Sequence, residues 1–295
     1  MNNKEIWIEE KLEINKGRTL KIKITKSLEK VKSKFQEIEV VDSDAFGKIL
    51  LINGIIMVTE SDEFCYHEMI AHVPLCVHPK AQKVLVIGGG DGGTVREILK
   101  HDNIKEVEVC EIDEKVIEVS KKHFPYLANS FDDPKVKICC EDGNKFIKDH
   151  KDEYDIIIVD SSDPIGPAEV LFRKEFYEAM YQALKDDGIV VTQAESFFYH
   201  RKIIKSLFSF IKKIYPISEY YYTLVPTYPS GVIGFMFCSK KYHPINDFNE
   251  TEALKLTDLK YYNRDVHKAS FALPNFVYHI FEQERKGYEG KNMCE

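Results

Sequence analysis

Short runs of apolar residues typical of strands, rather than helical periodicity, dominate the first part of the chain. Two such runs flank Asn53 and Gly54, a pair that tolerates the positive φ angles of a type I′ turn and therefore predicts a β-hairpin. From residue 61 onward the pattern becomes mixed. We therefore predict an N-terminal domain of β-strands and hairpins over residues 1–60 and a larger domain over residues 61–295.

The larger domain alternates near-continuous Val and Ile runs with helical segments. The predicted strands cover residues 83–87, 107–111, 136–140, 154–160, 189–193 and 232–239. The predicted helices cover residues 61–73, 94–100, 114–123, 173–184 and 200–214. Strands that are apolar throughout and separated by helices form a mostly parallel sheet covered on both faces. The predicted fold class is therefore α/β and doubly wound, and ligands should bind where the strands end.

A glycine-rich segment follows the first strand of this larger domain. Gly88, Gly90 and Gly93 match the pattern G-x-G-x-x-G, and the next strand ends in Glu111. In doubly wound folds such a loop approaches a bound nucleotide, and the acidic residue accepts hydrogen bonds from ribose hydroxyls. The pattern by itself fits both a nicotinamide dinucleotide and a nucleoside of the S-adenosylmethionine type.

Asp91 lies inside the glycine loop and favours the nucleoside. Its carboxylate would oppose a pyrophosphate at the helix N-terminus. The same charge would oppose the carboxylate of S-adenosylmethionine, whereas the decarboxylated form ends in an ammonium group. Asp142, Asp160 and Asp163 follow later strands, so they should reach the same edge of the sheet.

Seven segments together resemble the spermidine synthases, a polyamine aminopropyltransferase family. They are residues 35–38 (FQEI), 62–71 (DEFCYHEMIA), 84–93 (VLVIGGGDGG), 110–113 (CEID), 160–169 (DSSDPIGPAE), 226–231 (PTYPSG) and 261–267 (YYNRDVH). The resemblance covers nearly the whole chain. It implies a Rossmann-like, methyltransferase-type catalytic domain with a small N-terminal β domain, assembled into a homodimer or homotetramer.

The resemblance also implies roles for individual residues. The positions that would bind the adenosine part, together with the loop glycines, are Gln36, Gly88, Gly90, Glu111, Asp142, Gly143 and Pro167. The positions that would line the amine channel are Trp7, His67, Asp91, Asp163, Gln193 and Tyr228. Asp160 matches the catalytic acid-base residue, and Tyr66 could hydrogen-bond the same nitrogen. Decarboxylated S-adenosylmethionine would be a co-substrate, with no tightly bound cofactor.

The resemblance implies transfer of the aminopropyl group of decarboxylated S-adenosylmethionine to putrescine, which gives spermidine and 5′-methylthioadenosine. Cadaverine, agmatine and spermidine are alternative acceptors. The donor sulfur leaves as a neutral thioether, so alignment of the reactants is the main requirement. An ordinary aspartate, with a pKa of about 4, is too weak to deprotonate a free ammonium. We therefore expect Asp160 to orient the nitrogen and accept its proton as the new bond forms, assisted by burial. Asp91 and Asp163 would hold ammonium groups at the aminopropyl tail and at the distal amine.

Composition narrows the range of partners. The formal net charge of -7 argues against nucleic acid and fits a small cationic diamine. The N-terminus lacks a signal-peptide pattern and no apolar run has the length of a membrane span, so we expect a cytoplasmic protein with no membrane partner. The seven cysteines lack disulfide-framework spacing, and we expect reduced thiols in the core.

Other functions remain alternatives at this point. A putrescine N-methyltransferase that uses S-adenosylmethionine would share the fold and the nucleoside contacts. An NAD-dependent dehydrogenase is disfavoured by Asp91, and a catalytically silent polyamine sensor is disfavoured by the set of Asp160, Tyr66 and Asp163. His67 and His72 suggest a zinc site, but a spacing of five residues rotates the second side chain by about 140° around a helix. We therefore expect no metal.

Overall fold

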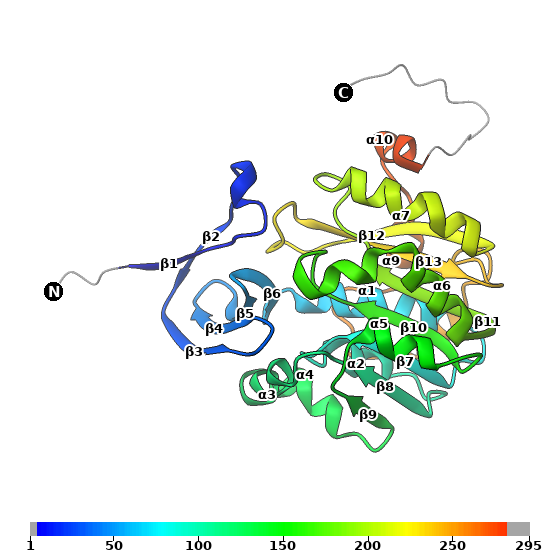
Figure 1. Cartoon of the computed structure of the whole chain (residues 1–295), viewed down its shortest axis with the longest axis horizontal. Helices are drawn as coiled ribbons and strands as arrows, with labels where there is room; N and C mark the ends of the chain where they lie inside the picture. Colours follow the sequence, from blue (N-terminus) through cyan, green and yellow to red (C-terminus); the bar gives the residue numbers. More distant parts are fainter. Residues whose placement is uncertain (1–4, 282–295) are drawn as a thin grey trace.

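Two antiparallel sheets form the N-terminal part of the computed structural model, which describes residues 5–281 (Figure 1). One sheet has two strands, β1 (Ile6–Glu9) and β2 (Lys21–Ile24). The other has four strands in the order β3 (Lys26–Lys32), β4 (Glu37–Ser43), β5 (Gly47–Ile52) and β6 (Ile55–Thr59). The predicted hairpin is present, since β5 pairs with β6 and both Asn53 and Gly54 have positive φ angles, of 53° and 81°.

A seven-stranded sheet forms the centre of the larger part. Its order is β12 (Ile217–Leu224), β13 (Val232–Ser239), β11 (Leu184–Gln193), β10 (Tyr154–Asp160), β7 (Lys83–Gly88), β8 (Glu106–Cys110) and β9 (Val136–Cys139). The strands from β11 to β9 pair in parallel, and β13 and β12 add antiparallel strands at one edge. The chain leaves β7 and β10 at the same edge of the sheet, so the loops after these strands lie side by side.

Helices cover both faces of this sheet. Alternate residues of β7 belong to two separate cores, Val84 and Val86 to one and Leu85 and Ile87 to the other. The first core includes α1 (Glu63–Leu75), α2 (Gly93–Ile98), α8 (Glu250–Lys255) and α9 (Arg264–Ala269). The second includes α5 (Gly143–Phe146), α6 (Lys174–Ala183), α7 (Arg201–Ile214) and α10 (Asn275–Tyr278). The predicted doubly wound α/β fold is therefore confirmed.

The N-terminal sheet packs onto the larger part through a third apolar cluster. Ile38 and Val40 of β4 contact side chains of α3 (Glu114–His123) and α4 (Pro125–Ala128), including Val116 and Leu127. The N-terminal sheet thus packs against the two helices that follow β8. No helix within residues 5–281 is long and apolar enough to cross a membrane.

The main differences from the predicted elements concern polar strands and the sheet edges. β12 was not predicted because its sequence, ISEYYYTL, is aromatic and polar rather than a Val and Ile run. β11 begins at Leu184, ahead of the predicted residue 189, and its additional residues are mostly polar. Polar residues of this kind are accommodated where one side of a strand faces solvent.

The described cysteines, from Cys65 to Cys238, are all free thiols. The prediction that they lie in the core is wrong for Cys139, which is partly exposed, and for Cys140, which is exposed. The reason is that β9 is the last strand of the sheet, so one of its sides is open. The seventh cysteine, Cys294, lies outside the described residues.

The junction of β7 and β10 leaves no room for a side chain at Gly88. These strands pair with Gly88 opposite Asp160, and the Gly89 N–H donates to the Asp160 carbonyl oxygen over 2.9 Å. A Cβ atom on Gly88 would lie 2.1 Å from that oxygen, and the φ angle of 85° also favours glycine. The glycine loop and the end of β10 are therefore held together at the carboxyl edge of the sheet.

Replacing Gly88 by alanine should destabilise the protein more than the same change at Gly17. Both residues have positive φ angles, 85° and 77°, but a Cβ atom on Gly17 would meet nothing within 4 Å. We expect Gly17→Ala to lower the free energy of unfolding by about 1–2 kcal/mol through backbone strain. Gly88→Ala should cost roughly 1–3 kcal/mol more because the two strands must separate. Urea denaturation of both variants measures this difference, and equal losses would contradict the steric explanation.

Candidate active site

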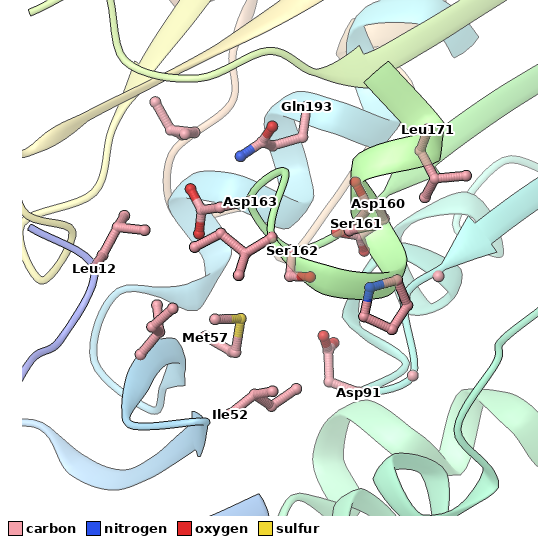
Figure 2. Close-up of a pocket in the computed structure, with 18 of the residues that line it drawn as sticks. Leu12, Ile52, Met57, Asp91, Asp160, Ser161, Ser162, Asp163, Leu171 and Gln193 are labelled. Atoms are coloured by element: carbon pink, nitrogen blue, oxygen red, sulfur yellow. The ribbon is translucent and has the colours of Figure 1, made fainter. Parts of the chain in front are cut away.

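A cavity lies where the N-terminal sheet faces the carboxyl edge of the seven-stranded sheet (Figure 2). Leu12, Ile52 and Met57 line it from the N-terminal part. The glycine loop and the segments that follow β8, β9, β10 and β11 line it from the larger part. The cavity therefore occupies the edge of the sheet where the sequence places the ligands.

One half of the cavity surrounds Glu111, which follows β8. Its side chain is buried and accepts the Asp113 N–H over 2.9 Å. Burial raises the pKa of Glu111 to about 7, although the hydrogen bond from Asp113 opposes this effect. Gln36 donates to Asp113 Oδ2 over 3.0 Å, so the loop between β3 and β4 is fixed beside this segment. A Cβ atom on Gly90 would lie 2.9 Å from Glu111 Oε2, which explains the glycine.

The loops after β9 and β10 complete this half. Asp142 caps the N-terminus of α5 by accepting the Asn144 N–H over 2.9 Å. A Cβ atom on Gly143 would lie 2.4 Å from Ile87 Cγ2, so glycine allows the first turn of α5 to approach β7 closely. Pro167 lines the cavity from the loop after β10.

An acidic cluster with one histidine lies at the centre of the cavity. Ring-nitrogen and carboxylate-oxygen atoms of His67, Asp91 and Asp160 lie within 4.8 Å of one another. Thr94 Oγ1 donates to Asp160 Oδ2 over 2.6 Å. Burial and then the charge of Asp91 raise the pKa of Asp160 above its usual value. Burial acts in the same direction on Asp91, but the neighbouring His67 outweighs it and keeps the pKa of Asp91 low.

Two tyrosines border this cluster. Tyr66 of α1 makes a side-chain hydrogen bond with Asp160, and its ring lies 6.3 Å from the ring of Tyr228, between centroids. Tyr228 Oη donates to the Met57 carbonyl oxygen over 3.1 Å. Burial raises the pKa of both phenols well above the usual value, so both are neutral donors at physiological pH.

A second acidic cluster lies at the other end of the cavity. Asp163 and Glu195 contact each other through their side chains, and burial followed by the charge of Glu195 raises the pKa of Asp163 well above its usual range. Glu195 forms an ion pair with His200, whose Nε2 lies 3.0 Å from Glu13 Oε1. Gln193 Oε1 is buried here without a hydrogen-bond partner among the described residues. Because Glu13 precedes β2, both parts of the protein form this end.

Comparisons with known proteins identify the family. Residues 63–250 match the family model described as the spermine/spermidine synthase domain, and residues 6–60 match the spermidine synthase tetramerisation domain. The chain belongs to the spermine/spermidine synthase family. A polyamine aminopropyltransferase of Leptospira biflexa is 52% identical over 273 residues, which cover 92% of this chain and 97% of that protein. Another, from Caldicellulosiruptor saccharolyticus, is 46% identical over 282 residues, covering 96% of this chain and all of that protein.

Solved structures of the family share the fold. A spermidine synthase in complex with the transition-state analogue AdoDATO superposes with a TM-score of 0.91 at 42% identity, covering 94% of each chain. Spermidine synthase from Thermotoga maritima gives a TM-score of 0.88 at 41% identity, also covering 94% of each chain. The predicted family, fold and type of enzyme, an aminopropyltransferase of the spermidine synthase type, are confirmed. The N-methyltransferase alternative is not supported.

The cavity brings together all but one of the residues that the sequence assigned to the site. Those that line it are Gln36, Tyr66, His67, Gly88, Gly90, Asp91, Glu111, Asp142, Gly143, Asp160, Asp163, Pro167, Gln193 and Tyr228. Trp7 is the exception, because it lies on β1, is 52% exposed and donates to Glu5 over 3.4 Å. Figure 1 shows β1 leading away from the catalytic part. The place assigned to Trp7 is therefore corrected, and Leu12, further along the same segment, reaches the cavity instead.

Several residues that contact these clusters were not predicted, among them Thr94, Glu195, His200, Glu13, and Glu63, which lies 2.6 Å from His67. Glu195 follows β11 by two residues. The expectation that ligands bind where the strands end, which identified Asp160, therefore applies to Glu195 as well. His200 and Glu13 come from segments far apart in the sequence, and no local pattern predicts their contact. Glu63 lies on α1, which is buried on almost every side and has no polar face to indicate its orientation.

The Glu111→Gln substitution should stabilise the ligand-free protein at alkaline pH. Folding raises the pKa of Glu111 from 4.5 to about 7, so the folded state disfavours ionisation. This carboxyl therefore contributes its full stability below pH 4.5 and loses it progressively as the pH rises through about 7. Glutamine does not ionise, so at pH 8 the variant should be more stable by on the order of 3 kcal/mol. Urea denaturation at pH 5 and pH 8 measures the gain, and a gain that does not grow with pH would contradict the perturbed pKa.

Proposed function

We propose that the chain transfers the aminopropyl group of decarboxylated S-adenosylmethionine to putrescine and releases spermidine and 5′-methylthioadenosine. The observation that carries the proposal is the pair of buried acidic clusters in one cavity, one around Asp91 and Asp160 and the other around Asp163 and Glu195. Two buried carboxylate clusters along one channel suit ligands that carry ammonium groups. The glycine loop beside the first cluster suits a nucleoside.

The donor's adenosine part fits the half of the cavity around Glu111. The Glu111 carboxylate would accept hydrogen bonds from the ribose hydroxyls, and Asp142 would accept one from the adenine amino group. Gln36 and Pro167 would close over the nucleoside from either side, and both line this cavity. Gly88, Gly90 and Gly143 let the segments around the nucleoside pack closely together, since a Cβ atom on any of them would overlap a neighbouring protein group.

Asp91 would hold the ammonium group of the donor's aminopropyl tail. Its low pKa keeps the carboxylate charged in the buried cluster. A charged carboxylate attracts an ammonium and repels the carboxylate of intact S-adenosylmethionine. Asp91 therefore selects the decarboxylated donor by charge.

The reaction is a direct displacement at the carbon next to the donor sulfur. The nitrogen lone pair of putrescine forms the new C–N bond while the C–S bond breaks, and the electron pair of that bond neutralises the sulfonium. The extra proton on nitrogen passes to Asp160, whose raised pKa makes it a better acceptor than an exposed aspartate. Tyr66, hydrogen-bonded to Asp160, would help to orient the attacking nitrogen. Alignment of the three reacting atoms supplies up to about 7–11 kcal/mol.

The distal ammonium of the acceptor fits the second acidic cluster. Asp163 would pair with it, and the buried Gln193 Oε1, which has no partner within residues 5–281, offers a further acceptor. Tyr228 and His67 border the path between the two clusters. An acceptor with a primary ammonium at its far end, such as putrescine, satisfies these groups.

We also propose that the chain consists of two domains, residues 1–60 and residues 61–295. The chain would act as an oligomer of identical subunits. The match of residues 6–60 to a tetramerisation domain supports assembly through the N-terminal domain, and a homotetramer or homodimer follows. A cytoplasmic location remains the expectation from the sequence.

Asp160→Asn should reduce kcat by roughly 10²–10⁴-fold, because asparagine cannot accept the proton of the attacking amine. Mass spectrometry of the products, with putrescine and either donor, measures this loss. Wild-type protein should form spermidine and 5′-methylthioadenosine from decarboxylated S-adenosylmethionine only. Wild-type activity should rise towards alkaline pH, since both a free amine and an ionised Asp160 are required.

Asp155→Asn is the matched control, since Asp155 is a buried aspartate on the same strand that pairs with Lys185 outside the cavity. Its kcat should stay near the wild-type value. N-methylputrescine from S-adenosylmethionine, or a flat pH profile between about pH 6 and 9, would argue against the proposed mechanism.

Binding of putrescine should release a proton from Asp163. Burial and the charge of Glu195 raise the pKa of this carboxyl well above its usual range, which favours its protonated form in the empty cavity, whereas a bound ammonium favours the ionised form. Affinity for putrescine should therefore increase with pH until Asp163 is ionised without ligand. Calorimetry with 5′-methylthioadenosine present, in buffers of different ionisation enthalpy, counts the released protons. Asp163→Asn should release fewer protons than wild type, and an unchanged number would contradict this assignment.

A further inference from the structure

Each ring nitrogen of His67 faces a carboxylate. Nδ1 lies 2.6 Å from Oε2 of Glu63 on the same helix, and Nε2 lies 3.2 Å from Oδ1 of Asp91 in the glycine loop. The exposed fractions of the three side chains are 3%, 2% and 14% in that order. A neutral imidazole donates through one nitrogen only, so donation to both carboxylates requires the imidazolium. In the imidazolium form His67 would therefore connect Glu63 to Asp91 through both of its nitrogens.

Glu63 and the ring of His67 are both held in place. Arg96 of α2 donates to Glu63 through Nη1 and Nη2, each over 3.0 Å, in a bidentate pair. Gly93 provides the space for the imidazole, because a Cβ atom there would lie 2.3 Å from His67 Cε1. The position of the imidazolium is thus fixed by α1, α2 and the glycine loop together.

The formal charges around His67 sum to one negative charge, which a single ammonium group can neutralise. The titratable and charged groups that face this histidine or its direct partners are Glu63 and Tyr66 from α1, Asp91 from the glycine loop, Arg96 from α2, Tyr126 from α4 and Asp160 from β10. Arg96 balances Glu63, since Glu97, which also contacts Arg96, is paired with Lys100. The imidazolium balances one of the two aspartates. The cluster retains one negative charge when Asp160 is ionised, which matches a single ammonium of the ligand.

We propose that Glu63 is a positioning residue for the amine site, which keeps His67 doubly protonated and directed at Asp91 so that Asp91 stays ionised for the donor's ammonium. This inference rests on the proposed function. Because both of its nitrogens are engaged, His67 acts through Asp91 and accepts no hydrogen bond from the incoming amine. Burial lowers the pKa of His67, but the two carboxylates outweigh it and raise the pKa well above its usual value.

The Glu63→Gln substitution tests this role, with Glu97→Gln as the matched control. Glu97 is also a buried carboxylate held by Arg96, 2.6 Å from Nε, but its histidine partner is His72 rather than His67. Each substitution removes a buried acid from an ion-paired network. A purely structural role for Glu63 would therefore give the two variants similar properties.

The first measurement is the charge of His67 in the ligand-free protein. Nitrogen-15 NMR of histidine-labelled protein distinguishes an imidazolium from a neutral ring, and His67→Gln assigns the signal. We expect an imidazolium at neutral pH in wild type and in Glu97→Gln, and a neutral ring in Glu63→Gln. A neutral His67 in the wild type overturns the proposal, and this result does not require any variant to fold.

The second measurement is steady-state kinetics. The KM for decarboxylated S-adenosylmethionine should rise on the order of 10- to 100-fold in Glu63→Gln, as for loss of a buried charge-assisted hydrogen bond, and kcat should fall less. In Glu63→Gln the acidic limb of the kcat/KM profile should move to higher pH. Without the imidazolium beside them, Asp91 and Asp160 would keep one shared proton up to a higher pH. In a His67→Gln background the Glu63 substitution should have no further effect.

Two kinetic results would overturn the proposal: equal losses in Glu63→Gln and Glu97→Gln, or additive losses in the Glu63 and His67 double variant. If wild-type protein formed no spermidine, the proposed function would fail. The NMR comparison would still decide whether Glu63 sets the charge of His67, so the two failures are distinguishable.

Discussion

The close approach of two backbones at Gly88 and Asp160 sets the geometry on which the cavity depends. No side chain fits between these strands, so the chain must turn there and begin α2 directly opposite the end of β10. The other two glycines of the pattern are explained by contacts of the same kind, Gly90 with Glu111 and Gly93 with the ring of His67. The three glycines are therefore explained by three close approaches, and each of them positions a titratable side chain of the site.

Burial of acidic groups at this edge creates an electrostatic problem that the structure resolves in two ways. Two histidines, His67 and His200, each lie between carboxylates, and those carboxylates raise the pKa of both rings against the effect of burial. Burial also raises the pKa of Glu111, Asp160 and Asp163, which favours their protonated, uncharged forms. An ammonium ligand can replace such a proton at little electrostatic cost, so the empty cavity is already adapted to cationic ligands.

The sequence predicts this arrangement wherever one strand or one loop determines it. Parallel strands bring their carboxyl ends to one edge, which is why Asp91, Asp160 and Asp163 could be placed together before the structure was known. Trp7 and Glu13 lie in the same short N-terminal segment, and only the docking of that segment decides that Glu13 reaches His200 while Trp7 stays exposed. Such contacts depend on tertiary packing, and no local periodicity encodes them.

The contrast between Asp91 and Asp160 connects the charge distribution to the chemistry. Both are aspartates in one buried cluster, yet one has a lowered pKa and the other a raised pKa. The lowered pKa suits a group that must stay charged to repel a carboxylate-bearing donor, and the raised pKa suits a group that must accept a proton. His67 lies against Asp91 and accounts for the difference. Selection of the donor and activation of the acceptor therefore depend on the same imidazolium, and so on the buried Glu63 behind it.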